Sequence, residues 1–316
     1  MDKNTVIISG YLKENTLEQV VSKNGKNAIR GNLVIATSPI ESHRVQFFVN
    51  ETTSAGEESK DYAALSALLP TKTITLASYL EANPEATFET ACDKVSKVWA
   101  TGYLDEFVRK DEEKGEISSV QVRGRRAGIK SPTSGKPFTP RAEFEAEIYI
   151  SEISKEVDKA GAETGRVNVV GLIPNYDQSV LKIPFVAPTE NGVAAYILGN
   201  YKVSDTTHIN GQLVNTVNRV LVESGSTNHF GTGGRDQYST TFVNERRILG
   251  GDATPIHQGE EGAISQSAAK IGLAKRESKA AANAVKPQPA KANFNTPKAP
   301  AATARASAPS ADDMDF

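Results

Sequence analysis

The sequence predicts a mainly β protein built from two five-stranded antiparallel barrels, the first with a helical insertion, followed by a disordered C-terminal tail. Three observations predict this fold class: short segments in which apolar and polar residues alternate, a second unit that repeats the plan of the first, and a final stretch rich in Ala, Pro, Lys and Ser. The chain has 316 residues, which exceeds the ~100 to 200 residues of one domain, so two folded domains and an appendage are expected.

The first domain is expected at residues 1–158. Alternation with period two indicates β-strands, and Asn24-Gly25 supplies a hairpin-type turn after the first of them. A helical insertion is expected near residues 51–93, where apolar residues have helical spacing ahead of Pro70. Strands are expected at 5–12, 27–37, 44–50, 95–109, 117–122 and 144–153, and helices at 60–69 and within 75–93.

The second domain, expected at residues 165–251, repeats this order. The two units share a local pattern in which an apolar residue, any residue and a glycine precede a further apolar residue. Gly10 and Gly171 lie in this pattern where the units begin, and Gly102 and Gly211 lie in it after each helical interval. Glycine within a strand usually marks a bulge or a tight bend, which a small closed barrel needs at its corners. Strands are expected at 166–173, 180–186, 201–213 and 238–249, and a helix at 193–198.

The tail is expected at residues 252–316. It has few aromatic or aliphatic side chains, so it cannot bury enough surface to offset the entropy of ordering. A transient helix at 263–284 is the only regular structure expected there. The last five residues differ in composition and form an acidic tip with a terminal aromatic side chain: Asp312, Asp313, Met314, Asp315 and Phe316.

Composition excludes several classes of protein. Hydrophobic residues make up 38% of the chain, and no window approaches the ~18 apolar residues of a membrane span. The N-terminus has no signal-peptide pattern, so a cytoplasmic protein is expected. Cys92 is the single cysteine and the four histidines are scattered, so neither a disulfide, a metal nor another cofactor is expected. No enzymatic activity is expected either, because Gly128 to Lys136 lacks the spacing of a phosphate-binding loop and no catalytic constellation stands out.

The charge is segregated along the chain. A net charge of −2 does not by itself indicate a nucleic-acid-binding protein. However, residues 51–93 contain eight acidic residues against two lysines, whereas residues 123–141 contain six basic residues and no acidic one. The acid-free run is predicted to be a basic loop that either wraps a nucleic-acid strand or is simply solvated. Its candidate binding residues are Arg123, Arg125, Arg126, Lys130 and Phe138.

The strand faces of the first domain predict a surface that binds nucleic acid. Successive residues of a strand point to opposite faces, and Val98, Ala100 and Leu104 form an apolar face that belongs to the core. The same test on neighbouring strands places aromatic and guanidinium side chains together on the outside: Tyr11, Arg30, Arg44, Phe48, Trp99 and Tyr103. Unpaired bases stack on such rings for ~1 to 3 kcal/mol each, whatever their identity, and arginines neutralise phosphates. The alternative is that each aromatic side chain packs in a core or at its rim.

The second domain offers fewer candidate binding residues. Lys202 lies near its fourth strand, and Phe230 and Arg235 lie in a Gly-rich segment at residues 224–236. This domain is therefore expected to bind more weakly or to serve dimerisation.

Beyond these patterns, the sequence resembles the bacterial and phage single-stranded DNA-binding protein family, as a divergent member with tandem barrels. Members of that family have an OB-type barrel with a helix between the third and fourth strands, and their last strand ends near Leu-Gly-Gly. Residues 193–213 resemble the helix and fourth strand, and residues 238–251, ending in Leu249-Gly250-Gly251, resemble the last strand. The resemblance implies two OB-type barrels that bind single-stranded DNA.

The tail is a second point of resemblance. Family members end in a flexible linker and a short acidic tip that closes with an aromatic residue, to which residues 312–316 are similar. The resemblance implies that Phe316 enters an apolar pocket of a partner while the aspartates meet its basic rim. Met314 and Asp315 stand where the family often has Ile-Pro. Because family members usually present four barrels, two barrels per chain imply a homodimer.

The predicted function is sequence-independent binding and protection of single-stranded DNA during replication, recombination and repair. The acidic tip is expected to recruit replication and recombination proteins. Two alternatives stay open, namely a phage structural or assembly protein built of β-domains, and an OB-type protein directed to RNA.

Overall fold

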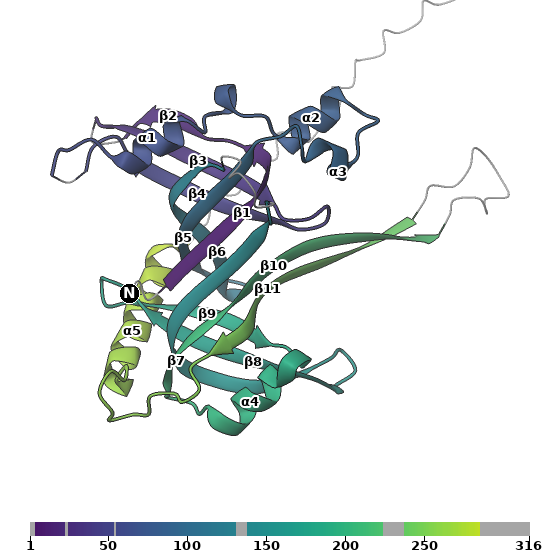
Figure 1. Cartoon of the computed structure of the whole chain (residues 1–316). Helices are drawn as coiled ribbons and strands as arrows, with labels where there is room; N and C mark the ends of the chain where they lie inside the picture. Colours follow the sequence, from purple (N-terminus) through teal and green to yellow (C-terminus); the bar gives the residue numbers. More distant parts are fainter. Residues whose placement is uncertain (1–3, 23–24, 54, 131–137, 224–236, 285–316) are drawn as a thin grey trace, which may run out of the picture. The chain divides into compact units, whose positions relative to one another are not determined.

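The chain is mainly β in the computed structural model, which describes residues 4–22, 25–53, 55–130, 138–223 and 237–284 (Figure 1). Eleven strands of this part form one sheet that closes on itself twice, as two barrels. The predicted fold class of two barrels with OB topology is confirmed by the strand pairing described below. No helix of the described residues is long and apolar enough to cross a membrane.

The first barrel closes in the order expected of an OB fold. Its strands are β1 (Asn4–Asn15), β3 (Asn27–Ala36), β4 (Ser42–Asn50), β5 (Lys97–Asp111) and β6 (Gly115–Ile129). β1 pairs antiparallel with β3 and β5, β3 pairs with β4, and β5 pairs with β6. β4 runs parallel to β6 and thereby closes the barrel. A short strand, β2 (Glu18–Val21), extends the sheet beyond β3.

Short helices occupy the interval between β4 and β5, as predicted. They are α1 (Lys60–Ser66), η1 (Pro70–Lys72), α2 (Leu76–Ala82) and α3 (Phe88–Ala91). Ser59, Thr75 and Thr87 cap the three α-helices, because each side chain accepts a hydrogen bond from the backbone N–H three residues further on. Tyr62 and Leu65 are buried against the barrel, which agrees with their helical spacing.

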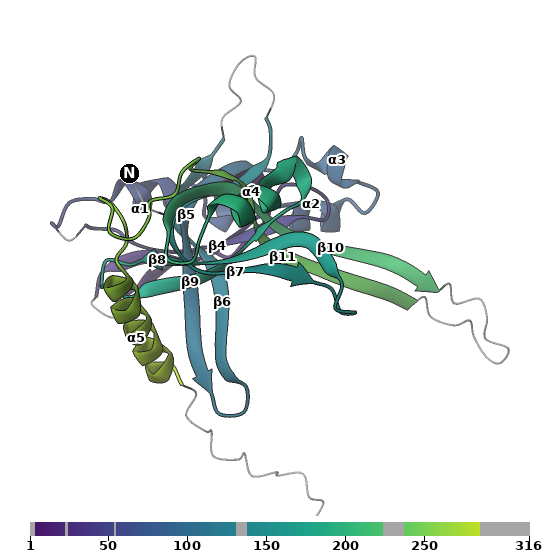
Figure 2. The ribbon, with the colours of Figure 1, turned by 90° about the horizontal axis from the view of Figure 1, so that it is seen from below.

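The second barrel repeats this topology. Its strands are β7 (Arg141–Val157), β8 (Glu163–Pro174), β9 (Val180–Ala187), β10 (Thr206–Glu223) and β11 (Gln237–Gly251). β7 pairs with β8 and β10, β8 with β9, and β10 with β11, while β9 runs parallel to β11. Between β9 and β10 lie η2 (Glu190–Gly192) and α4 (Val193–Asn200), at the position of the predicted helix. Beyond the barrel, β10 and β11 continue as a two-stranded ribbon (Figure 2).

Gly102 and Gly211 occupy equivalent positions in the two barrels. Each lies in the fourth strand of its barrel, where the pairing with the fifth strand shifts by one residue. A Cβ atom at either glycine would lie 2.0 Å from a carbonyl oxygen, that of Arg123 or that of Arg247. Gly102 and Gly211 therefore mark a β-bulge in both barrels, in agreement with the predicted duplication. The other predicted pair is not equivalent, because Gly10 lies in the first strand of its barrel and Gly171 lies in β8, the second strand of the second barrel.

The two barrels are joined through their first strands. β1 pairs antiparallel with β7, and Val6 lies opposite Phe144 in this ladder. By strand pairing, the second barrel begins at Arg141, earlier than the residue 165 expected from the sequence. The strand expected at 144–153 therefore belongs to the second barrel and not to the first. Alternation locates this strand, but only its partners β8 and β10 reveal which barrel contains it.

Residues 123–129 form the second half of β6, although the whole run 123–141 was expected to be a loop. These residues pair with β5, where Arg126 lies opposite Thr101. A run rich in arginine and glycine has little intrinsic preference for a strand, so the pairing partners decide its conformation.

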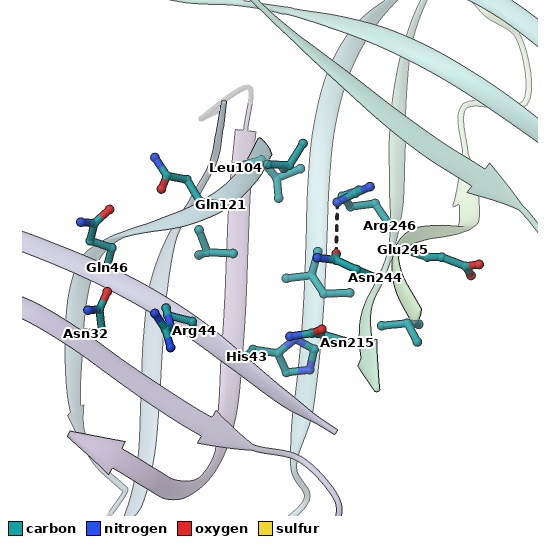
Figure 3. A pocket seen from close by; sticks show the side chains of 14 residues that line it. Asn32, His43, Arg44, Gln46, Leu104, Gln121, Asn215, Asn244, Glu245 and Arg246 are labelled. Carbon is teal, nitrogen blue, oxygen red and sulfur yellow. Dashed lines mark hydrogen bonds between the residues drawn. The ribbon is translucent and has the colours of Figure 1, made fainter. Parts of the chain in front are cut away.

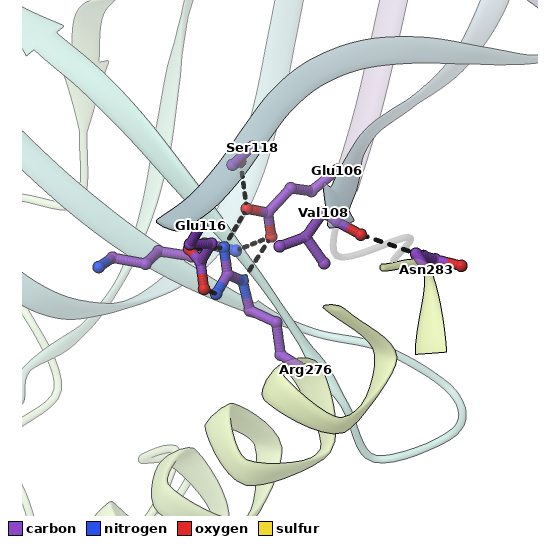
Figure 4. A network of polar contacts seen from close by, with 7 residues as sticks. Glu106, Val108, Glu116, Ser118, Arg276 and Asn283 are labelled. Carbon is purple, nitrogen blue, oxygen red and sulfur yellow. Dashed lines mark hydrogen bonds and ion pairs between the residues drawn. The ribbon is translucent and has the colours of Figure 1, made fainter. Parts of the chain in front are cut away.

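Residues 252–284, expected as the start of the disordered tail, are part of the folded body and include α5 (Gln266–Ala282). The buried face of α5 consists of small side chains and one arginine, Arg276. Arg276 donates two hydrogen bonds to Glu106, at 2.6 and 2.9 Å, and two to Glu116, at 2.8 and 2.9 Å (Figure 4). The composition of residues 252–284 indicated a tail because α5 is held against the barrels by charge pairing and small residues rather than by large apolar side chains. Residues 285–316 lie outside the described part.

Candidate nucleic-acid interface

The inner and outer faces of the first barrel agree with the predicted alternation. Val98, Ala100 and Leu104 are buried, so they form the core as expected. Ser9 is the exception, because alternation with the buried Ile8 places it on the outer side of β1 and it is nevertheless buried. The six residues predicted on the outside are exposed or half-buried, with Phe48 at 54%: Tyr11, Arg30, Arg44, Phe48, Trp99 and Tyr103.

Pairing between strands aligns several of these side chains on one surface. Tyr103 of β5 lies opposite Arg123 of β6, which in turn pairs with Gln46 of β4. Gln46 lies opposite Asn32 of β3. The next row along β3 and β4 again joins an aromatic side chain to a guanidinium: Phe48 and Arg30. We call this surface of β3, β4, β6 and β5 the outer face of the first barrel.

The arginines of the outer face differ in whether a carboxylate neutralises them. Arg30 pairs with Glu18 at 2.7 Å, and Arg123 pairs with Asp105 at 3.0 Å. Arg44 is exposed and forms no ion pair with any carboxylate of the described residues. An anion therefore meets an uncompensated charge at Arg44, whereas it competes with a carboxylate at Arg30 and Arg123.

Two aromatic side chains of β5 are partly covered. The guanidinium of Arg125 lies over the ring of Tyr103, 5.2 Å from its centroid. Trp99 packs against Gly128, where a Cβ atom would lie 3.0 Å from the indole Nε1. Both rings remain half-buried rather than enclosed, so each can present an edge or a face at the surface.

Tyr11 belongs to a separate aromatic cluster. Its ring meets Phe88 of α3 and Phe138 edge to face, with centroids 5.8 and 5.4 Å apart. The Nζ of Lys97 lies 5.9 Å from the same ring, and burial raises the pKa of the Tyr11 hydroxyl. Tyr11 thus packs against Phe88 of α3 and against Phe138, which is the alternative that the sequence left open for this aromatic residue.

The remaining predicted binding residues lie apart from the outer face. Arg126 pairs with Asp61 of α1 at 2.6 Å. Lys130 is exposed just after β6, and Lys202 is exposed after α4 in the second barrel. Outside the described residues lie Phe230, Arg235 and the acidic tip at 312–316.

A trough extends from the outer face of the first barrel to the second barrel. It consists of three hollows: one over Arg30 and Phe48, a central cavity of about 370 Å³ between the barrels, and one beside α5. Figure 3 shows the central cavity. Neighbouring hollows adjoin, since they share lining residues: Asn32 and Gln46 for the first two, and Val120, Asn244 and Arg246 for the last two.

The polar side chains that the second barrel contributes to this trough include Asn215, Asn244 and Arg246, and the two asparagines were not predicted as binding residues. Arg246 donates to the carbonyl oxygen of Pro184 at 2.9 Å and to Asn244 Oδ1 at 3.3 Å. It forms no ion pair with a carboxylate in the part of the chain that the structure describes. Burial lowers the pKa of Arg246 below its usual value, but an arginine stays charged at neutral pH. Residues 244–247 of β11 are all polar, so alternation does not show which of them face the trough.

Several solved structures match the chain over most of its length at low identity. The wild-type single-stranded DNA binding protein from Thermus aquaticus is 14% identical, and the match covers 83% of this chain and 96% of that chain with a TM-score of 0.43. A deletion mutant of the same protein is 12% identical, with coverages of 82% and 97% and a TM-score of 0.42. A replication protein A heterotrimer bound to ssDNA is 8% identical, with coverages of 89% and 70% and a TM-score of 0.21.

The family is identified by the sequence itself. No curated protein matches the chain. A family model described as YorF matches residues 3–283, which include both barrels and α5. The OB topology agrees with the fold that the resemblance to single-stranded DNA-binding proteins implied, and the chain belongs to the YorF family.

Proposed function

We propose that this protein binds single-stranded DNA through the outer face of the first barrel and the adjoining trough, largely without sequence preference, in replication, recombination and repair. The observation that carries the proposal is the position of Phe48. Its ring is 54% exposed, lies opposite Arg30 and shares its strand with the unpaired Arg44. Unpaired bases stack on an exposed ring while phosphates bind nearby guanidiniums. Duplex bases are already stacked, so this arrangement favours single strands.

The charges of the trough support the same proposal. Arg44 and Arg246 lack carboxylate partners among the described residues and both line the central cavity. A phosphate placed there replaces water around a cation without displacing an internal ion pair. The paired arginines contribute less, since a phosphate must compete with Glu18 or Asp105.

The test is a titration of a labelled oligo-dT strand followed by fluorescence anisotropy at increasing salt. Phe48→Ala should weaken binding about 10-fold, because one stacked base is worth ~1 to 3 kcal/mol. Arg44→Ala should lower the dependence of log K on log salt by about one, because one phosphate contact is lost. Tyr176→Ala serves as the aromatic control, since Tyr176 is 99% exposed and does not line the trough. Arg109→Ala serves as the arginine control.

The outcomes separate the alternatives. Salt-sensitive binding with a change in Trp99 fluorescence supports the proposal. If the protein does not bind oligo-dT at low salt, the proposal is wrong and a structural or assembly role of a phage β-domain protein takes its place. If an RNA homopolymer competes better than DNA, the ligand is RNA.

The proposal extends to partners. The acidic tip at residues 312–316 recruits replication and recombination proteins, and deleting it should leave the affinity for oligo-dT unchanged. A large loss of affinity would instead place the tip in the DNA-binding surface. The protein forms a homodimer of four barrels, which light scattering tests, and a monomeric mass would exclude it.

A further inference from the structure

The central cavity of the trough has an unusual number of side-chain amides. It lies where β10 and β11 of the second barrel face β3, β4 and β6 of the first (Figure 3). Five carboxamides line it, and apolar side chains form the rest of its wall together with His43, Arg44, Glu245 and Arg246. The carboxamides come from both barrels: Asn32, Gln46, Gln121, Asn215 and Asn244.

Two of these amides present a donor and an acceptor next to each other. Asn215 and Asn244 are directly opposite in the β10–β11 ladder. Asn215 donates through Nδ2 to the carbonyl oxygen of Ser42 at 2.7 Å, which leaves its Oδ1 as an acceptor. Asn244 accepts through Oδ1 from Arg246, which leaves its Nδ2 as a donor. Directly opposite residues of an antiparallel pair have Cβ atoms ~5 Å apart, so the two free groups are close enough to bind one planar ligand.

His43 supplies a third group that lacks a partner. The side chain is 3% exposed, and its Nε2 forms no hydrogen bond with the described residues. The nearest carboxylate oxygen, of Glu41, is 3.7 Å away. His43 follows Ser42, to which Asn215 is hydrogen-bonded, so the imidazole and the Asn215 amide lie at the same end of the cavity. A buried polar atom without a partner costs free energy. Nε2 has almost no accessible surface, so a ligand in the cavity meets the rest of the His43 side chain and not this atom.

These groups match a nucleobase. The edge of a base carries a hydrogen-bond donor beside an acceptor, and asparagine and glutamine read base edges through their amides. Leu104, Leu213 and Val120 provide apolar contacts for the flat faces of a base. Arg44 and Arg246 flank the cavity and can bind the phosphates on either side of that nucleotide.

We propose that the central cavity holds one nucleobase of the bound strand and reads its edge through Asn215 and Asn244. This rests on the proposed function and refines it. Most bases bind by stacking regardless of identity, but one position has a preference. The protein is then not wholly indifferent to sequence, and the second barrel provides the discrimination.

The experiment compares four oligo-dT strands, three of which carry one central A, C or G. One of the four should bind about 10-fold tighter than the weakest, because a base contact of this kind discriminates by about that factor. Asn215→Ala and Asn244→Ala should each remove the preference while changing the affinity for plain oligo-dT much less. Asn218→Ala is the matched control, because Asn218 is exposed on the same ribbon and does not line the cavity.

Asn244→Asp is a second variant that separates a loss of base preference from a loss of folding. The carboxylate has the shape of the amide but replaces the free donor by an acceptor, so the preference should be lost or transferred to another base while the thermal midpoint stays the same. Equal binding of all four strands by the unmodified protein, or a preference that survives in Asn215→Ala and Asn244→Ala, overturns the inference alone. Absence of binding to every strand overturns the proposed function as well.

Discussion

The two barrels share one topology and differ in what they carry on the outside. When the barrels are aligned on Gly102 and Gly211, Tyr103 corresponds to Gln212 and Trp99 to His208. Neither of these two aromatic side chains has an aromatic counterpart in β10. The pairing of the third strand with the fifth extends this alignment. Gln46 pairs with Arg123 in the first barrel and Val186 pairs with Arg247 in the second, so Gln46 and Val186 are equivalent. Arg44 and Phe48 then correspond to two prolines: Pro184 and Pro188.

This difference separates the requirements of the fold from those of binding. The glycines at the bulges and the apolar inner faces recur because closing a small barrel requires them. The outward positions carry no such constraint, so they can differ between the copies. The first barrel retains exposed rings, while both barrels supply amides to the cavity between them.

The helix α5 contacts both barrels, and the two attachments differ in burial. Toward the first barrel, the side chains of Arg276 and Glu106 are 5% and 1% exposed. Toward the second barrel, Lys279 pairs with Asp177 at 2.6 Å, and these side chains are 47% and 33% exposed. The same helix is therefore held by a buried network on one side and a solvated ion pair on the other.

The largest expected effect is the loss of the buried attachment. Arg276→Met should lower the free energy of unfolding by about 3 to 5 kcal/mol, because it leaves the carboxylate of Glu106 buried without its partner. Lys279→Met should cost about 1 kcal/mol or less, because water solvates Asp177. Urea unfolding followed by circular dichroism measures both. Equal losses for the two variants would show that the attachments do not differ as their burial indicates.

A smaller effect is expected on binding. Tyr103→Ala should weaken the affinity for oligo-dT about 10-fold, because it removes a stacking surface and the support of Arg125. Gln212→Ala, at the corresponding position of the second barrel, should change the affinity less than about 2-fold. Isothermal titration at constant salt gives both values. A larger loss for Gln212→Ala would contradict the assignment of stacking to the first barrel.

The smallest effect concerns pH. Hydrogen bonds from Arg276 hold the pKa of Glu116 below its usual value of 4.5, and a hydrogen bond from Lys279 lowers that of Asp177. A carboxyl group with a lowered pKa in the folded state stabilises the fold fully above its unfolded pKa, and that contribution disappears as the pH falls through the folded value. The fold loses free energy of unfolding as the pH falls below about 4.5. Either Glu116→Gln or Asp177→Asn should reduce that loss, each by under about 1 kcal/mol. Urea unfolding from pH 6 to 3 tests this, and unchanged slopes would exclude a contribution from these pairs.

Local alternation was sufficient to predict much of the first barrel. Apart from the buried His43 and Glu106, the inner positions in β4 and in most of β5 are small or apolar, so the outward position of Phe48 and Tyr103 followed from the sequence. The helical interval before β5 was also predictable, because its apolar residues have helical spacing.

Features that depend on partners distant in sequence were not predictable. The strand at Arg123 to Ile129 and the membership of β7 depend on which strands they pair with. Arg276 gives no local sign of a buried helix, since Glu106 lies 170 residues earlier. The central cavity was missed for the same reason, because Asn32 and Asn244 come from different barrels.

The ladder between β1 and β7 has a consequence for self-association. Val6 lies opposite Gly102, and Phe144 lies opposite Gly211, so Val6 and Phe144 are equivalent residues. They also lie opposite each other, as equivalent residues do across the two-fold axis of an isologous dimer. The chain thus contains, as a covalent pseudo-dimer, the contact that two separate barrels would form through their first strands. That edge is already occupied, so a second copy of the protein has to associate through a different surface.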